Sequence, residues 1–134
     1  MIQRWIDDIR RWASGWLPTL IPKPSIIVST SVAHVLDIPE FLEPGRAVLV
    51  AEDPSRPQWL GFDCPCRRHH RLLINLADSR RPRWTYQLDK RGKITLYPSV
   101  DSVSDVGRCH FWLRRGTTTW IGAPAAPVPG TLHP

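Results

Sequence analysis

Residues 59–70 read WLGFDCPCRRHH, a short apolar run that leads directly into two cysteines and two histidines. A second stretch, residues 108–112, reads RCHFW and carries the third cysteine and another histidine. All three cysteines and three of the five histidines of the chain therefore fall in these two places. Thiolate and imidazole are the ligands that Zn²⁺ prefers in proteins. We expect either a metal site or a catalytic site where the two stretches meet.

The chain has 134 residues, enough for one domain with a modest core. Its fourteen prolines argue against long central helices, and its seven tryptophans supply large apolar surfaces to bury. The net charge of +6 would suit nucleic acid or an acidic protein, but the basic residues are scattered along the sequence, so nucleic acid is unlikely.

The sequence predicts a cytoplasmic protein. An odd number of cysteines makes a poor disulfide framework. No apolar run approaches the ~20 residues of a membrane span. The N-terminus lacks the apolar stretch and cleavage site of a secretory signal.

Both ends of the chain differ from its middle. Residues 1–17 have the pattern of an amphipathic helix that docks on the core or on a partner, because apolar residues recur every three or four positions. These residues are Ile2, Ile6, Ile9, Trp12 and Trp16. Residues 122–134 are rich in proline and alanine without periodicity, which predicts a flexible tail. The remaining residues, 18–121, are predicted to form a single β-rich domain.

The middle of the chain has the pattern of short strands, with a possible helical turn at residues 37–42. Candidate strands, of which we expect six or seven to form, cover residues 26–29, 47–51, 59–62, 72–75, 84–88, 93–97, 109–113 and 117–121. Hairpin turns are predicted at residues 89–92 and 114–116, each ending in glycine. The predicted fold is α+β and mostly β, with the N-terminal amphipathic helix followed by a small, largely antiparallel sheet.

The cysteines and histidines have the distribution of a zinc clasp. Cys64 and Cys66 flank Pro65, which favours the bend that two thiols need to converge on one ion. The ligands, four at most, would come from Cys64, Cys66, His69, His70, Cys109 and His110. Zn²⁺ bound in this way would be structural, because it would close a long loop. A regular strand over residues 109–113 would direct Cys109 and His110 to opposite faces. The competing interpretation is a set of buried thiols and polar histidines without a metal.

The same region also permits a hydrolase site. Ser99 is a candidate nucleophile with His110 as its base and Asp101 or Asp105 as the orienting carboxylate. Cys109 is the alternative nucleophile, and its base would have to come from elsewhere, for example from His69 or His70, because adjacent residues on a strand diverge.

The order of motifs from Trp59 to Trp120 resembles a family of small bacterial proteins of no assigned activity. Its members carry Cys-Pro-Cys, Pro-Arg-Trp, a Thr-Leu-x-Pro-Ser stretch, and His-Phe followed by a glycine hairpin and a tryptophan. Here these motifs are Cys64-Pro65-Cys66, Pro82-Arg83-Trp84, Thr95-Leu96-Tyr97-Pro98-Ser99, His110-Phe111, Gly116 and Trp120. Relatives have serine before His-Phe, where this chain has Cys109, and commonly glycine after Cys-Pro-Cys, where it has Arg67.

Members of this family look like companions of bacterial ubiquitin-like conjugation operons. The resemblance implies partners that include a ubiquitin-like protein and E1- and E2-like enzymes. It also implies a role in attaching, processing or removing the modifier, with a processing or deconjugating peptidase as the first expectation. A non-enzymatic adaptor that holds the modifier or an E2-like partner is the second, and a nucleic-acid-binding module is the third. The substitution at Cys109 is open to two interpretations, a thiol nucleophile or a recruited metal ligand.

Overall fold

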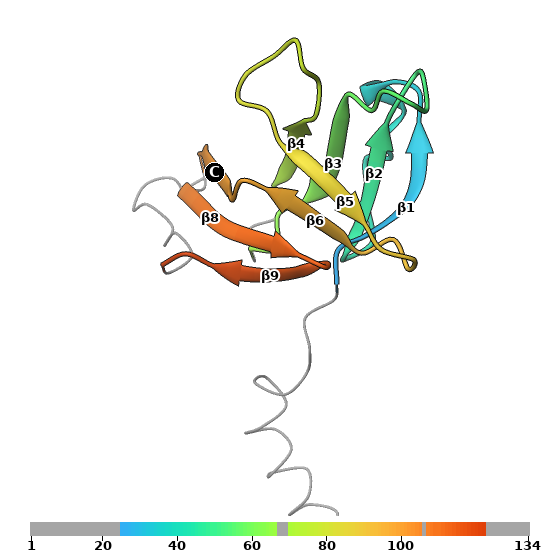
Figure 1. Ribbon diagram of the computed structural model, residues 1–134. Helices are drawn as coiled ribbons and strands as arrows, with labels where there is room; N and C mark the ends of the chain where they lie inside the picture. Colours follow the sequence, from blue (N-terminus) through green and yellow to red (C-terminus); the bar gives the residue numbers. More distant parts are fainter. Residues whose placement is uncertain (1–24, 67–69, 106, 123–134) are drawn as a thin grey trace, which may run out of the picture.

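The computed structural model describes residues 25–66, 70–105 and 107–122 of the chain. These residues form nine strands and one 3-10 turn, arranged as three sheets that pack around a common core (Figure 1).

The first sheet has four strands in the order β1-β2-β3-β4. They are β1 (Ile27–Val32), β2 (Arg46–Val50), β3 (Trp59–Asp63) and β4 (Arg71–Asn75). β1 and β2 run parallel, and the other neighbours run antiparallel. The β1–β2 connection contains the 3-10 turn η1 (Val35–Asp37), which stops at Ile38, where the backbone becomes extended before Pro39.

The other two sheets are built from consecutive hairpins. β5 (Thr85–Leu88) pairs with β6 (Ile94–Tyr97), and β7 (Val100–Ser104), β8 (Gly107–Arg114) and β9 (Thr117–Trp120) form the third sheet with β8 in the centre. β6 lies beside β8 and so connects the two sheets (Figure 1). Both predicted hairpin turns are confirmed, between β5 and β6 and between β8 and β9.

The core is formed by the inward-facing side chains of all three sheets. Its largest fully buried members include Leu60, Phe62, Ile94, Leu96, Phe111 and Leu113. Gly116 in the β8–β9 turn has a φ of +76°, and a Cβ atom there would lie 2.9 Å from the Ile26 carbonyl oxygen. Only glycine satisfies both conditions, so this turn can pack directly against the residues that precede β1.

The prediction of an α+β fold is wrong. The part of the chain that the structure describes contains no α-helix, and its strands form three sheets where one was expected. The physical reason is that strand pairing depends on residues distant in sequence: residues 100–104, VDSVS, have no regular apolar alternation, yet they form the unpredicted strand β7 by pairing with β8 and so complete a separate sheet with β9. The predicted helix at residues 1–17, and the predicted tail at residues 122–134 except for Gly122, lie outside the described residues.

Candidate functional site

β8 carries candidate site residues on both of its faces. Its buried positions alternate regularly, so Cys109 points inward with Phe111 and Leu113, whereas His110 points outward and is half-buried. The expectation that these two neighbours diverge is therefore confirmed. Each of them belongs to a different cluster of side chains.

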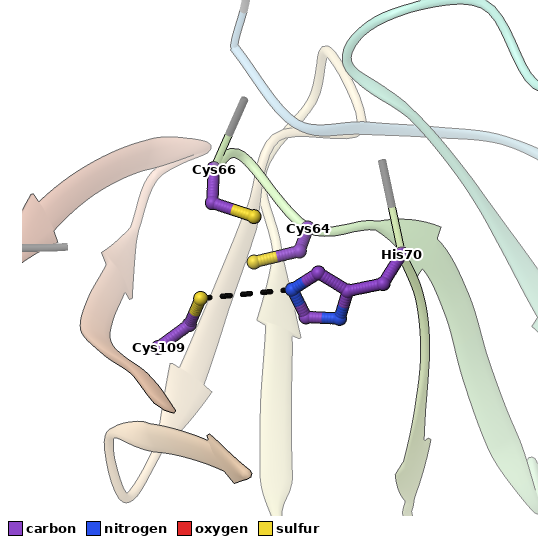
Figure 2. A group of neighbouring side chains, drawn as sticks. All are labelled: Cys64, Cys66, His70 and Cys109. Atoms are coloured by element: carbon purple, nitrogen blue, oxygen red, sulfur yellow. Dashed lines mark hydrogen bonds between the residues drawn. The ribbon is translucent and has the colours of Figure 1, made fainter. Parts of the chain in front are cut away.

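The inward cluster consists of Cys64, Cys66, His70 and Cys109 (Figure 2). One ligand atom from each residue lies within 4.8 Å of the others, so these four residues can bind a metal ion. The Cys109 Sγ atom is 3.6 Å from His70 Nε2. Residues from the β3–β4 connection and from β8, far apart in the sequence, thus converge on one point.

The β3–β4 hairpin explains why Cys64 and His70 lie together. Asp63 pairs with Arg71 at the end of the two strands. The Cys64 amide then donates to the His70 carbonyl at 2.9 Å, so Cys64 and His70 lie opposite each other just beyond the strands. Cys64 also continues the inward face of Leu60 and Phe62. Burial raises the pKa of the Cys64 thiol far above its usual range. A thiol in such a place becomes a thiolate only with a compensating positive charge, which a bound cation supplies.

The outward cluster begins with Ser99 and His110. The Ser99 Oγ atom lies 2.9 Å from His110 Nε2, which is hydrogen-bonding distance. Ser99 precedes β7 directly, and His110 is near the middle of β8, so the antiparallel pairing of these two strands brings them together. Both residues are half-buried and are reached from solvent.

Asp101 faces His110 across the β7–β8 pair. Residues directly opposite in an antiparallel pair share a face, so the carboxylate is on the same side as the imidazole. Arg108 donates twice to Asp101, at 2.8 Å for both bonds. These hydrogen bonds lower the pKa of the Asp101 carboxyl, and its negative charge interacts favourably with a positive charge on His110.

Trp84 contacts the backbone of Ser99. Its indole Nε1 donates to the Ser99 carbonyl oxygen at 3.2 Å, and its own amide donates to the Asn75 carbonyl at 2.9 Å. Asn75 is a buried polar residue whose side chain bonds to residues of the β4–β5 connection. Sequence reasoning missed both Trp84 and Arg108. Arg108 directly precedes the predicted strand at residues 109–113 and lies two residues before His110, and this spacing was a usable signal for one of them.

The remaining predicted residues lie elsewhere. Asp105 is exposed in the β7–β8 turn, beyond the last register pair, Ser104 with Gly107. His69 lies outside the described residues. A surface pocket lined by Ser25, Ile27, Glu43 and Arg46, among others, includes none of the candidate site residues.

The model of one protein family matches residues 34–121, which include β2 to β9 and both clusters. Its description is bacterial ubiquitination-like system serine protease (BubE). The chain belongs to this family. The resemblance drawn from the motifs is thereby confirmed, and the protein is part of a bacterial ubiquitination-like system. No curated protein and no solved structure matches the chain. Among the described residues, no helix has the length and apolar character needed to cross a membrane.

Proposed function

We propose that the protein is a serine peptidase that processes or removes a ubiquitin-like modifier, with Ser99 as nucleophile, His110 as general base and Asp101 as the orienting carboxylate. The observation that carries the proposal is the 2.9 Å contact between Ser99 Oγ and His110 Nε2. The description of the BubE family as a serine protease supports the same reaction class.

The proposed reaction needs only these side chains and water. Ser99 Oγ attacks the scissile carbonyl carbon while His110 Nε2 takes the hydroxyl proton, and the carbonyl electrons move to oxygen. When the tetrahedral intermediate collapses, the bond to the leaving group breaks and His110 returns the proton to it. Water then repeats the sequence on the acyl-enzyme and releases the modifier with a free carboxylate.

Asp101 acts on the charged form of the base in this scheme. An imidazolium forms on His110 during each attack, and the opposed Asp101 carboxylate stabilises it electrostatically. The two hydrogen bonds from Arg108 keep that carboxylate ionised and fix its direction.

Cys109 is assigned to the metal cluster and not to the nucleophile. Its side chain is 0% exposed and faces the core, where a protein substrate has no access. Its neighbours there are Cys64, Cys66 and His70, all metal-ligand types. The cysteine that replaces the relatives' serine is thus best explained as a recruited ligand.

We propose that the ion is Zn²⁺ and that it is structural. Bond lengths of about 2.3 Å to sulfur and about 2.0 Å to nitrogen place tetrahedral ligands roughly 3.5–3.8 Å apart. The 3.6 Å between Cys109 Sγ and His70 Nε2 fits this spacing. Three thiolates and one imidazole would complete the coordination of zinc, which leaves no position for catalysis. Zinc would link the β3–β4 connection to β8 within one domain, residues 18–121. The three free cysteines also suit a protein of the reducing cytoplasm.

A non-enzymatic adaptor is the second candidate function. It is favoured by Leu36 and Phe41 in the β1–β2 connection, whose exposed fractions are 95% and 77%. An adaptor would bury such side chains against its partner, which removes apolar surface from water. An adaptor would bind the modifier or an E2-like protein without cleaving anything.

The test is to incubate the purified protein with the ubiquitin-like precursor and with modifier conjugates of the same system, and to follow cleavage by mass spectrometry. A fluorophosphonate probe should label Ser99 in the intact protein, and iodoacetamide should leave activity unchanged. Ser99→Ala and His110→Ala should abolish cleavage, whereas Cys109→Ser, which introduces the relatives' residue, should retain Ser99 labelling. Binding without cleavage or labelling would establish the adaptor.

A further inference from the structure

The two hairpin turns at one end of the fold gather basic side chains that are scattered in the sequence. The β5–β6 turn carries Lys90, Arg91 and Lys93, and the β8–β9 hairpin carries Arg114 at the end of β8 and Arg115 in the turn. We call these five residues the basic end.

Backbone hydrogen bonds bring the two turns together. The Gly92 carbonyl accepts from Val28, the Gly116 carbonyl accepts from Ile26, and the Gly116 amide donates to the Ile94 carbonyl, each at 2.7 or 2.8 Å. The Arg115 amide also donates to Thr95 Oγ1 at 2.9 Å. Both turns therefore pack on the same short segment before and within β1, and their side chains extend from neighbouring positions.

The basic end holds the positive excess of the described residues. Residues 25–66, 70–105 and 107–122 contain twelve Lys or Arg and ten Asp or Glu. Five of the cations but only one of the carboxylates, Asp89, belong to the two turns, so seven cations face nine carboxylates elsewhere. The Asp89 carboxylate accepts from the backbone amides of Arg91 and Lys93. None of the ion pairs found among the described residues involves a cation of the basic end.

The outer face of β8 connects this end to Ser99. His110, Trp112 and Arg114 are two residues apart from one another along β8 and therefore share that face. The Arg114 guanidinium lies 4.6 Å from the Trp112 ring centroid. Arg114 lies four residue steps beyond His110 along the strand, about 13 Å at roughly 3.3 Å per residue. A folded domain of about 100 residues has a radius of gyration of about 13 Å, so one bound with its terminus at Ser99 reaches the basic end.

We infer that the basic end is the docking surface for an acidic face of the ubiquitin-like modifier whose terminal bond Ser99 cleaves. The inference rests on the proposed function, because the distance to Ser99 selects the substrate as the occupant. The excess of cations over carboxylates at the basic end attracts an acidic surface from a distance and orients it. Nucleic acid is less well suited, because the aromatic ring beside these cations, Trp112, already stacks against the Arg114 guanidinium.

The test compares two double substitutions of equal charge change in the full chain. Lys90→Glu with Arg91→Glu alters the basic end, and Arg56→Glu with Arg81→Glu alters exposed arginines elsewhere. Both are made in the Ser99→Ala background, and binding to the purified modifier of the same system is measured at low and high salt. The first pair should weaken binding about tenfold or more and reduce its salt dependence, and the second should change it less than about twofold.

Equal effects of the two pairs, or no effect of either, would overturn the inference. The inference would also be overturned if Lys90→Glu with Arg91→Glu lost binding to a short DNA duplex but kept its affinity for the modifier. Fluorophosphonate labelling of Ser99 tests the proposed function independently of modifier binding. For this measurement Lys90→Glu with Arg91→Glu is also made with Ser99 retained, and labelling at the wild-type rate shows that the site is intact. A protein that binds the modifier through the basic end, but is neither labelled nor catalytic, retains the docking surface and loses the peptidase assignment.

Discussion

The two faces of β8 carry adjacent residues with opposite surroundings. Cys109 is buried with two other thiols and a histidine, whereas His110, the next residue, contacts Ser99 on the solvent side. The difference arises from strand alternation alone, because each residue is rotated to the opposite face from its neighbour. Neighbouring polar residues in a motif therefore need not share a function. The predictions below test whether the inward face supplies stability and the outward face supplies chemistry.

The largest expected effect is on the outward face. Ser99→Ala should reduce kcat by about 10³-fold or more, because the nucleophile is lost and little of the catalytic machinery works without it. Its melting temperature should stay near that of the wild type, since a half-buried hydroxyl contributes little to the core. Residual cleavage close to the wild-type rate would show that Ser99 is not the nucleophile.

Removal of an inward ligand should have the opposite signature. Cys64→Ser should release the metal and lower the melting temperature by about 10 °C or more, because the link between the β3–β4 connection and β8 is lost. Elemental analysis and thermal denaturation measure both effects, with Arg91→Ala as a surface control that changes neither. Wild-type protein prepared without chelator and free of metal would contradict the zinc assignment.

A smaller effect is expected at the carboxylate opposite His110. Asp101→Asn should lower kcat about tenfold with KM unchanged, because the exposed carboxylate is partly screened by water. Arg108 lowers the pKa of Asp101, so its charge is present at neutral and mildly acidic pH and is lost only as the pH falls through that lowered value. An unchanged kcat would restrict the outward site to Ser99 and His110.

The smallest effect is expected for the hydrogen bond between Trp84 and the Ser99 backbone. Trp84→Phe removes the indole donor to the Ser99 carbonyl while keeping an aromatic ring in place. One such hydrogen bond is worth about 0.5–1.5 kcal/mol, so kcat should fall roughly two- to tenfold. Trp59→Phe, which alters a tryptophan stacked under Arg80, is the matched control and should leave the labelling rate of Ser99 unchanged. The labelling rate of Ser99 is compared in both variants. An equal fall of this rate in Trp59→Phe and Trp84→Phe would mean that Trp84 acts only through stability.

Local patterns in the sequence were sufficient for much of the secondary structure. Short apolar runs and alternating residues predicted strands at the places of β1 to β6, β8 and β9, and Gly92 and Gly116 predicted the turns of the β5–β6 and β8–β9 hairpins. The same alternation predicted that Cys109 and His110 diverge. The fold class was wrong because local patterns do not indicate which strands pair, and the unpredicted strand β7 separated the third sheet from the others.

By itself, the sequence determined which residue types were available: three thiols, a histidine beside one of them, and a serine in a motif shared with a family. Only the tertiary structure selected among them. It brought His70 to the thiols through the β3–β4 register, and Ser99 to His110 through the β7–β8 register. It also brought Trp84 to Ser99 and two basic turns to one end of the fold. The physical reason is that such contacts depend on the pairing and packing of strands distant in sequence, which no local periodicity encodes.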